Sequence, residues 1–168
     1  MVLVGLSGSG KTAVGRLVAG ELGASLVDVD ARIEAEEGLS VSRIFVERGE
    51  QVFRELERRA VELTLSSDPC VVVPGGGWAA QDGNLADASG KCTTIYLQTT
   101  PSEAAGRVAR EGNRPLLAGG DPVQRLAEML EARARFYERA DHVVATDGRS
   151  VAEVARDVLA LARSGAAW

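Results

Sequence analysis

The sequence predicts an α/β fold in which a five-stranded parallel sheet lies between layers of helices. Short runs of β-branched residues alternate with longer segments of helical periodicity, which is typical of this class. Several of the short runs are almost entirely apolar, as strands covered on both faces are. The chain has 168 residues, 45% of them hydrophobic, and this length suits one compact domain. We therefore expect residues 1–168 to form a single three-layer domain.

The five short runs are the expected strands, because each is rich in β-branched residues. They are residues 2–4, 25–29, 70–73, 93–98 and 142–146. The longer segments carry apolar residues at helical spacing. They predict helices over about residues 10–22, 41–48, 51–65, 101–110, 123–139 and 150–162. Pro101 and Pro122 stand where the first turn of a helix accepts proline.

One segment between two predicted helices, residues 111–121, reads EGNRPLLAGGD. Its three glycines and its proline resist a continuous helix and permit hinge motion. Two interpretations remain open: a plain surface loop, or a mobile lid that closes over a site.

The composition excludes several classes of function. A net charge of −5 and a pI near 5.0 make nucleic acid a poor partner. No apolar stretch has the roughly 18 residues of a membrane span, and residues 1–5 lack the basic start of a signal peptide. Cys70 and Cys92 form no CxxC motif and His142 is the only histidine, so a zinc site or a Ser-His-Asp triad lacks parts. We expect a cytoplasmic protein with buried thiols and no membrane partner.

A glycine-rich segment, GLSGSGKT at residues 5–12, follows the first strand and opens a helix. It fits GxxxxGK[ST], the Walker A loop of ATP-binding proteins, in the context that this motif requires. Backbone N–H groups of such a loop surround phosphate oxygens, and the positive end of the following helix faces the same anion. Lys11 would span the β- and γ-phosphates, and Thr12 would bind Mg²⁺. A dinucleotide-binding turn is disfavoured, because the glycine spacing is GxxGxG and a lysine follows. The predicted ATP-binding residues here are Gly8, Ser9, Gly10, Lys11, Thr12 and Ala13.

Two carboxylates, Asp28 and Asp30, stand at the end of the second predicted strand. Alternate residues of a strand share a face, so we expect both to point to the edge of the sheet where α/β proteins bind ligands. One carboxylate would hold a water of the metal shell, and the other would orient an attacking hydroxyl and accept its proton. The alternative for Asp30 is the N-cap of a helix that starts at Ala31.

Four arginine and glycine features complete the set of candidates. Arg54 and Glu57 are three residues apart on a predicted helix, so they can pair, although a surface ion pair is the ordinary explanation. The glycines at 75–77 would let a ligand approach the backbone, or form a flexible turn. Arg114 in the lid could enter the site, and Arg133 could bind a carboxylate bidentately, but solvated arginines are the alternative for both.

Taken together, these segments resemble the shikimate kinase family. The shared features are the Walker A loop, DVD after the second strand, FRELE at 53–57, the GGG turn, RPLL at 114–117 and RxxxY at 133–137. They follow one another in the order of the family over nearly the whole chain. The resemblance implies a P-loop kinase fold, with substrate-binding helices at about 31–65, that transfers the γ-phosphate of ATP to the 3-hydroxyl of shikimate.

The resemblance also implies a role for each matching residue. Lys11, Asp30 and Arg114 would be catalytic, Thr12 would bind Mg²⁺, and Asp28 would support the metal through a water. The remaining contacts to ATP would come from Arg110, Arg114 and Arg149. The site for shikimate would consist of Asp30, Phe45, Phe53, Arg54, Gly75, Gly76, Gly77 and Arg133. We expect a monomer whose only ligands are ATP with Mg²⁺ and shikimate.

Three residues depart from the pattern of the family: Pro74 before the glycines, Trp78 after them, and Arg135 where a proline is common. Pro74 and Trp78 could reshape the pocket for a related hydroxy acid. The alternatives are therefore a kinase for a nucleoside monophosphate or gluconate, and a nucleotide-binding relative without activity.

Overall fold

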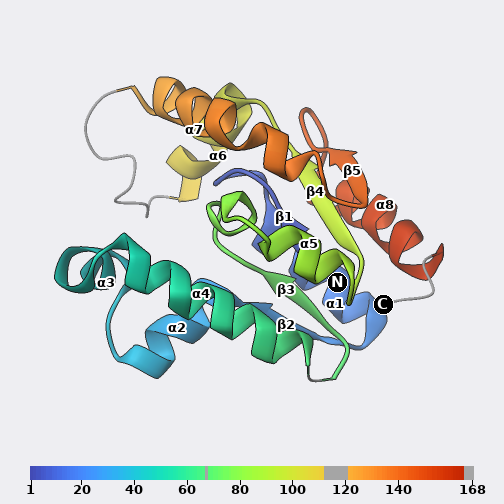
Figure 1. Ribbon diagram of the computed structural model, residues 1–168. Helices are drawn as coiled ribbons and strands as arrows, with labels where there is room; N and C mark the ends of the chain where they lie inside the picture. Colours follow the sequence, from blue (N-terminus) through green and yellow to red (C-terminus); the bar gives the residue numbers. More distant parts are fainter. Residues whose placement is uncertain (67, 112–120, 165–168) are drawn as a thin grey trace.

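A five-stranded parallel sheet forms the centre of the protein, as the computed structural model shows (Figure 1). The structure describes residues 1–66, 68–111 and 121–164. The strands run in the order β2-β3-β1-β4-β5, and every pair is parallel. Their bounds are β1 Val2–Val4, β2 Ser25–Asp28, β3 Cys70–Val73, β4 Thr94–Gln98 and β5 His142–Ala145. The predicted α/β class and strand number are confirmed.

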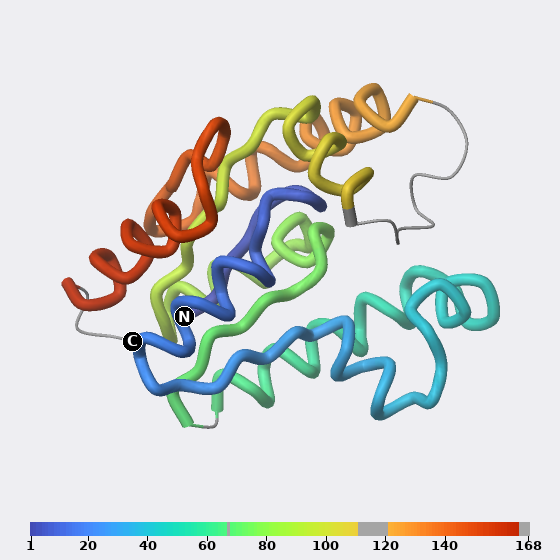
Figure 2. The backbone as a smooth tube through the Cα atoms, turned by 180° about the vertical axis from the view of Figure 1, so that it is seen from behind, coloured from blue at the N-terminus to red at the C-terminus, as the bar shows by residue number. Residues whose placement is uncertain are grey.

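Helices cover both faces of the sheet, which gives three layers. The α-helices are α1 Lys11–Leu22, α2 Val29–Glu37, α3 Val41–Arg48, α4 Glu50–Leu65, α5 Asn84–Ser89, α6 Pro101–Glu111, α7 Pro122–Tyr137 and α8 Val151–Ser164. One core contains Val2 and Val4 with residues of α2, α4, α5 and α7. A second core contains Leu3 with residues of α1 and α8. Figure 2 shows the backbones of these two helices, in blue and red, from behind. Alternate residues of β1 thus serve opposite cores, as the pleat of a strand requires.

The second strand is shorter than predicted. It ends at Asp28, and Val29 already begins α2, so Asp30 lies on a helix. Apolar periodicity did not predict this helix, because only Val29 and Ile33 of α2 are buried. A helix from Ala31 was expected only as the alternative for Asp30 and from the family resemblance, and α2 begins two residues earlier. Helix α5 and the short 3₁₀ helix at Trp78–Ala80, each of six residues or fewer, were not predicted.

The strand order brings three connecting segments to one edge of the sheet. Strands β2, β3 and β1 are neighbours, and in a parallel sheet their carboxyl ends meet on one side. The glycine loop follows β1, Asp28 ends β2, and the three glycines follow β3. The pairing of Asp28 with Val73 places the last two of these side by side.

The part of the chain that the structure describes holds no helix long and apolar enough to cross a membrane. The predicted lid is mostly outside that part, since residues 112–120, with Arg114, are not described.

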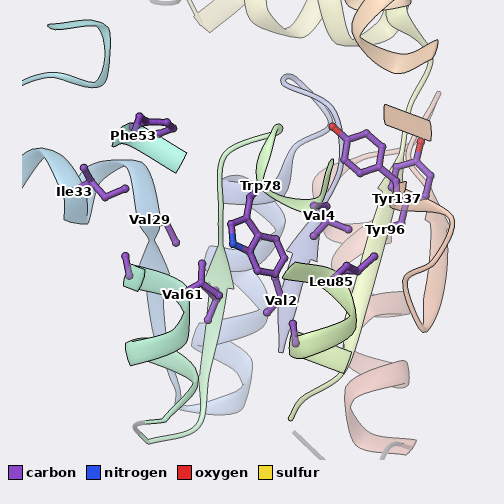
Figure 3. Packing of buried hydrophobic residues seen from close by; sticks show 14 of the residues in the cluster. Val2, Val4, Val29, Ile33, Phe53, Val61, Trp78, Leu85, Tyr96 and Tyr137 are labelled. Atoms are coloured by element: carbon purple, nitrogen blue, oxygen red, sulfur yellow. The ribbon is translucent and has the colours of Figure 1, made fainter. Parts of the chain in front are cut away.

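The side chain of Tyr137 connects the end of α7 to the glycine turn. This side chain is fully buried and stacks on Tyr96, with ring centroids 5.1 Å apart. Its hydroxyl donates a short hydrogen bond to the carbonyl of Gly76. Figure 3 shows both tyrosines in the core that also contains Trp78.

We predict that Tyr137→Phe lowers the free energy of unfolding by about 1 kcal/mol, because it leaves a partly buried carbonyl without its donor. Urea denaturation measures this change. Tyr96→Phe removes a hydroxyl from the other ring of the same stack and is the matched control, with a smaller expected loss. Equal losses in the two variants would contradict a specific role for the bond to Gly76.

Candidate active site

One cavity of about 610 Å³ lies at the carboxyl edge of the sheet. The glycine loop, the start of α2, helices α3 and α4, the glycine turn and α7 all contribute to its wall. It brings together most of the residues that the sequence analysis selected. These are Gly8, Gly10, Lys11, Thr12, Ala13, Asp28, Asp30, Phe45, Phe53, Arg54, Gly75, Gly76, Gly77 and Arg133.

The glycine loop has the geometry of an anion cradle. Gly8 and Gly10 have φ angles of 83° and 90°, which favour glycine, and a Cβ at Gly8 would lie 2.5 Å from the carbonyl oxygen of Ala104. Gly10 is the N-cap of α1 and has no side chain to cap the helix, and the first turn has no acidic residue. Lys11 Nζ donates to the carbonyls of Gly5 (2.9 Å) and Leu6 (3.0 Å), which fixes the cation at the loop. The loop can therefore hold phosphate oxygens between backbone amides and one ammonium group.

Thr12 and Asp28 meet beside this loop. The Thr12 hydroxyl donates to Asp28 Oδ2 at 3.1 Å. Asp28 also caps α2, since its Oδ1 accepts from the amide of Ala31 at 3.3 Å. The cap is therefore Asp28, and the alternative that made Asp30 the cap is wrong. The expectation that both carboxylates share a strand face is also wrong, because Asp30 lies in the first turn of α2.

Arg54 and Glu57 form a buried pair. Glu57 has an exposed fraction of 0% and its Oε2 accepts from Arg54 Nη1 at 2.8 Å, so the alternative of a surface ion pair is wrong. Glu57 Oε1 accepts from the amide of Gly75 at 2.9 Å. Burial raises the pKa of Glu57 to about 7, although the charge of Arg54 and its hydrogen bond act in the opposite direction. Glu57 thus joins α4 to the glycine turn.

The glycine turn is narrow because charged side chains pack against it. A Cβ at Gly75 would lie 2.6 Å from Glu57 Oε1 and 3.1 Å from Asp30 Oδ1. A Cβ at Gly77 would lie 2.5 Å from Arg54 Nη2. The described φ angles of this turn are not positive, so space rather than backbone conformation requires glycine. The turn therefore holds Asp30 and Arg54 close to the same backbone.

An aromatic wall supports Arg54. The rings of Phe45 and Phe53 lie 4.7 Å apart, and the Arg54 guanidinium carbon lies 5.7 Å and 5.3 Å from their centroids. This contact orients the cation and covers one side of the cavity with apolar surface. Arg133 of α7 also lines the cavity, one helical turn before Tyr137. The cavity can therefore accommodate a small apolar ring that carries an acid group.

A second cavity of about 450 Å³ lies on the other side of the glycine loop. Gly8, Ser9, Gly10 and Ala13 line it together with Arg110 and Arg149. The Ser9 hydroxyl is buried and has no hydrogen-bond partner among the described residues.

Arg149 is held at this cavity by hydrogen bonds to the Ala145 carbonyl (2.9 Å) and Asp157 (2.7 Å). Arg107, which the sequence analysis missed, also lines it and donates to the Thr146 hydroxyl (3.0 Å) and carbonyl (2.7 Å). Arg107 lies three residues before Arg110 on the same helix face, and this spacing could have identified it as a residue of the same site.

Several residues of the first cavity were also missed. Arg16 and Glu50 lie four residues from Thr12 and Arg54 on their helices, a spacing that could have revealed them. Leu126 and Met129 line the cavity from α7, and nothing in the sequence pattern marks them.

Two residues near the glycine turn, Pro74 and Trp78, depart from the family pattern, and the structure places them differently. Pro74 does line the first cavity. Trp78 does not: it is 2% exposed and packs among Val2, Val61 and Leu85 in the core (Figure 3). The expectation that Trp78 reshapes the pocket is wrong, because its indole points into the protein interior.

The chain is similar to known proteins of one family. A family model described as shikimate kinase matches residues 7–163. The chain is 39% identical over 158 residues to shikimate kinase of Moorella thermoacetica, which covers 94% of this chain and 91% of that protein. It is 41% identical over 159 residues to shikimate kinase of Thermobifida fusca, and this match covers 95% of this chain and 91% of that protein.

Solved structures give the same result. Shikimate kinase of Acinetobacter baumannii in complex with shikimate has a TM-score of 0.90 at 33% identity and covers 97% of this chain and 92% of that chain. A gluconokinase of Sinorhizobium meliloti has a TM-score of 0.62 at 24% identity, covering 97% of this chain and 93% of that one. The second likeness shows the fold alone.

The raised pKa of Glu57 predicts a pH dependence of stability. A carboxyl group whose pKa rises on folding from 4.5 to about 7 stabilises the fold most below pH 4.5, and this contribution is lost as the pH rises through 7. We predict that the free energy of unfolding falls across this range by on the order of 3 kcal/mol through Glu57. In Glu57→Gln, which has no charge to bury, urea denaturation should show a flatter profile. Parallel profiles for the two proteins would contradict this assignment.

Proposed function

This chain belongs to the shikimate kinase family, and from that membership we propose that it transfers the γ-phosphoryl group of ATP to the 3-hydroxyl of shikimate. The product is shikimate 3-phosphate, an intermediate of aromatic amino-acid biosynthesis. One observation carries the proposal for this chain: the phosphate cradle and the arginines Arg54 and Arg133 line a single cavity. The phosphates of a nucleotide and a small acid bound at these groups would share one cavity.

The glycine loop is the proposed site for the phosphates of ATP. Amides from Gly8 to Ala13 would surround the β-phosphate, and Lys11 would neutralise charge on the transferring group. The second cavity, next to the loop, would take the adenosine between Arg110 and Arg149. Arg114, outside the described residues, would approach the γ-phosphate from the proposed lid at about 111–121.

Thr12 and Asp28 would hold Mg²⁺: the Thr12 hydroxyl would be an oxygen ligand of the kind that this ion prefers, and the Asp28 carboxylate next to it would bind a water of the metal shell. When bound, Mg²⁺ neutralises phosphate charge during transfer. Two protein groups are enough, because Mg²⁺ in kinases keeps several waters and binds phosphate oxygens.

The acid would lie against the aromatic wall. Arg54 and Arg133 would bind its carboxylate, and the turn at 75–77 would cover its ring. Asp30 would accept a hydrogen bond from the 3-hydroxyl and take its proton as the oxygen attacks in line. The glycine turn places Asp30 near Arg54, so a rigid ring can reach both groups.

The helices α2, α3 and α4 would form the substrate-binding part of a single domain, as predicted for residues 31–65. The enzyme would act as a monomer in the cytoplasm. The described groups proposed to bind phosphate and acid all come from one chain, which supports the monomer, and the free thiols Cys70 and Cys92 suit a reducing compartment.

Release of ADP, followed with and without shikimate, tests the function. The proposal predicts ADP release that depends on shikimate and stays near background with gluconate or nucleoside monophosphates. Release with one of these compounds instead would identify another acceptor. No acceptor-dependent release with any of them would indicate a nucleotide-binding relative without activity.

We predict that Asp30→Asn lowers kcat by about 100-fold or more, because general-base groups contribute on this scale and asparagine cannot accept the proton. Asp82→Asn, which changes an exposed aspartate outside the cavity, is the control. Near-normal turnover in Asp30→Asn would remove Asp30 from the role of base.

We predict that Asp28→Asn raises the Mg²⁺ concentration needed for half-maximal activity by roughly tenfold, since loss of a group that positions a metal shell commonly costs this much affinity. A Mg²⁺ titration at saturating ATP measures it. Asp30→Asn should leave the half-maximal concentration unchanged; an equal shift in both variants would argue against a specific metal role for Asp28.

A further inference from the structure

The Arg54 guanidinium is packed so that a ligand reaches it along its N–H edges. Its carbon lies 5.7 Å and 5.3 Å from the centroids of Phe45 and Phe53. The backbone of Gly77 also lies against it, because a Cβ there would be 2.5–2.7 Å from its atoms. The side chain is only 15% exposed. Rotation of the group is restricted, and the hydrogen-bond directions are fixed.

Protein carboxylates already occupy these directions. Glu50 Oε1 accepts from Nε at 3.2 Å and from Nη2 at 3.0 Å, the two donors of one edge. Nη1, which belongs to the other edge, donates to Glu57 Oε2 at 2.8 Å. A guanidinium binds a carboxylate most strongly through two parallel N–H groups of one edge. A substrate carboxylate that binds the Nε–Nη2 edge in this way must therefore replace Glu50.

The two glutamates differ in how easily they can leave. Glu57 is fully buried and also accepts from the Gly75 amide, so its departure would leave a buried charge without partners. Glu50 is 63% exposed, lines the mouth of the cavity, and bonds Arg54 as an i,i+4 pair at the start of α4. Exposed pairs of this kind contribute little, because water replaces the partner.

We propose that Glu50 binds the Nε–Nη2 edge of Arg54 while the site is empty, and that the carboxylate of the acid substrate displaces Glu50 from this edge. This inference rests on the proposed function. Glu50 holds the cation in its binding orientation while the site is empty, and it competes with the incoming acid. The competition lowers the affinity of the site for acids and leaves its affinity for uncharged ring alcohols unchanged. Displacing Glu50 is therefore a free-energy cost that only a carboxylate ligand has.

Isothermal titration calorimetry of Glu50→Gln tests the exchange. Glutamine keeps the length of the side chain and removes its charge. The dissociation constant for shikimate should fall by about two- to fivefold, the range that loss of a weak competing ion pair gives. Cyclohex-1-ene-1-carboxylate, which has the acid group and no hydroxyl, should gain by the same factor. The corresponding carboxamide and ATP should show no gain.

Glu55→Gln is the matched control, because Glu55 is an exposed glutamate of the same helix that contacts Gln51 and does not line the cavity. It should leave the dissociation constants of both acids unchanged. A dissociation constant that is unchanged or higher in Glu50→Gln would overturn the exchange and make Glu50 a support for Arg54. Equal gains for the acid and the carboxamide would also overturn it.

The result is separable from the proposed function. If the unmodified protein binds no shikimate, the proposed function fails. If the unmodified protein binds shikimate, Arg133→Ala weakens this binding and Glu50→Gln does not strengthen it, then the proposed function stands and only the exchange at Arg54 fails.

Discussion

The buried carboxylate of Glu57 connects helix α4 to the glycine turn, the two parts of the proposed acid-binding region. It accepts from the amide of Gly75 and from the guanidinium of Arg54, and no part of the side chain is exposed. A buried carboxylate is tolerated only when such partners are in place, so the glycine turn and α4 hold each other in position. Arg54 packs in turn on Phe45 and Phe53. The orientation of this cation, and with it the proposed recognition of a carboxylate, depends on Glu57.

The order of the strands determines where the glycine loop and the proposed acid-binding region meet. β1 lies between β3 and β4, so the glycine loop that follows β1 is next to the turn that follows β3. Helices α2, α3 and α4 are inserted between β2 and β3, and they carry Asp30 and Arg54 to the same edge. A glycine turn without side chains leaves room for these charged groups. With both reactants bound as proposed, the sheet would hold phosphate and acid at a fixed separation, which transfer between bound reactants requires.

Much of the fold could be predicted from the sequence, since the strands are short apolar runs and the glycine loop has a strict spacing. The spacing of Arg54 and Glu57 predicts that they pair, but it does not reveal that α4 presents Glu57 to the interior. Asp30 was placed on a strand because alternation in LVDVD resembles one, whereas Asp28 caps a helix there. Met129 and Leu126 approach the cavity only through the packing of α7, which no local pattern encodes. In each of these examples, contacts between residues far apart in the sequence determine where the side chain lies.

A crystal structure with shikimate, Mg²⁺ and a non-hydrolysable ATP analogue would test the central claim most directly. The account predicts that the carboxylate of shikimate contacts Arg54 and Arg133, and that its 3-hydroxyl lies between Asp30 and the terminal phosphate at Lys11. Shikimate bound away from that phosphate, or with its carboxylate directed to Lys11, would contradict the account.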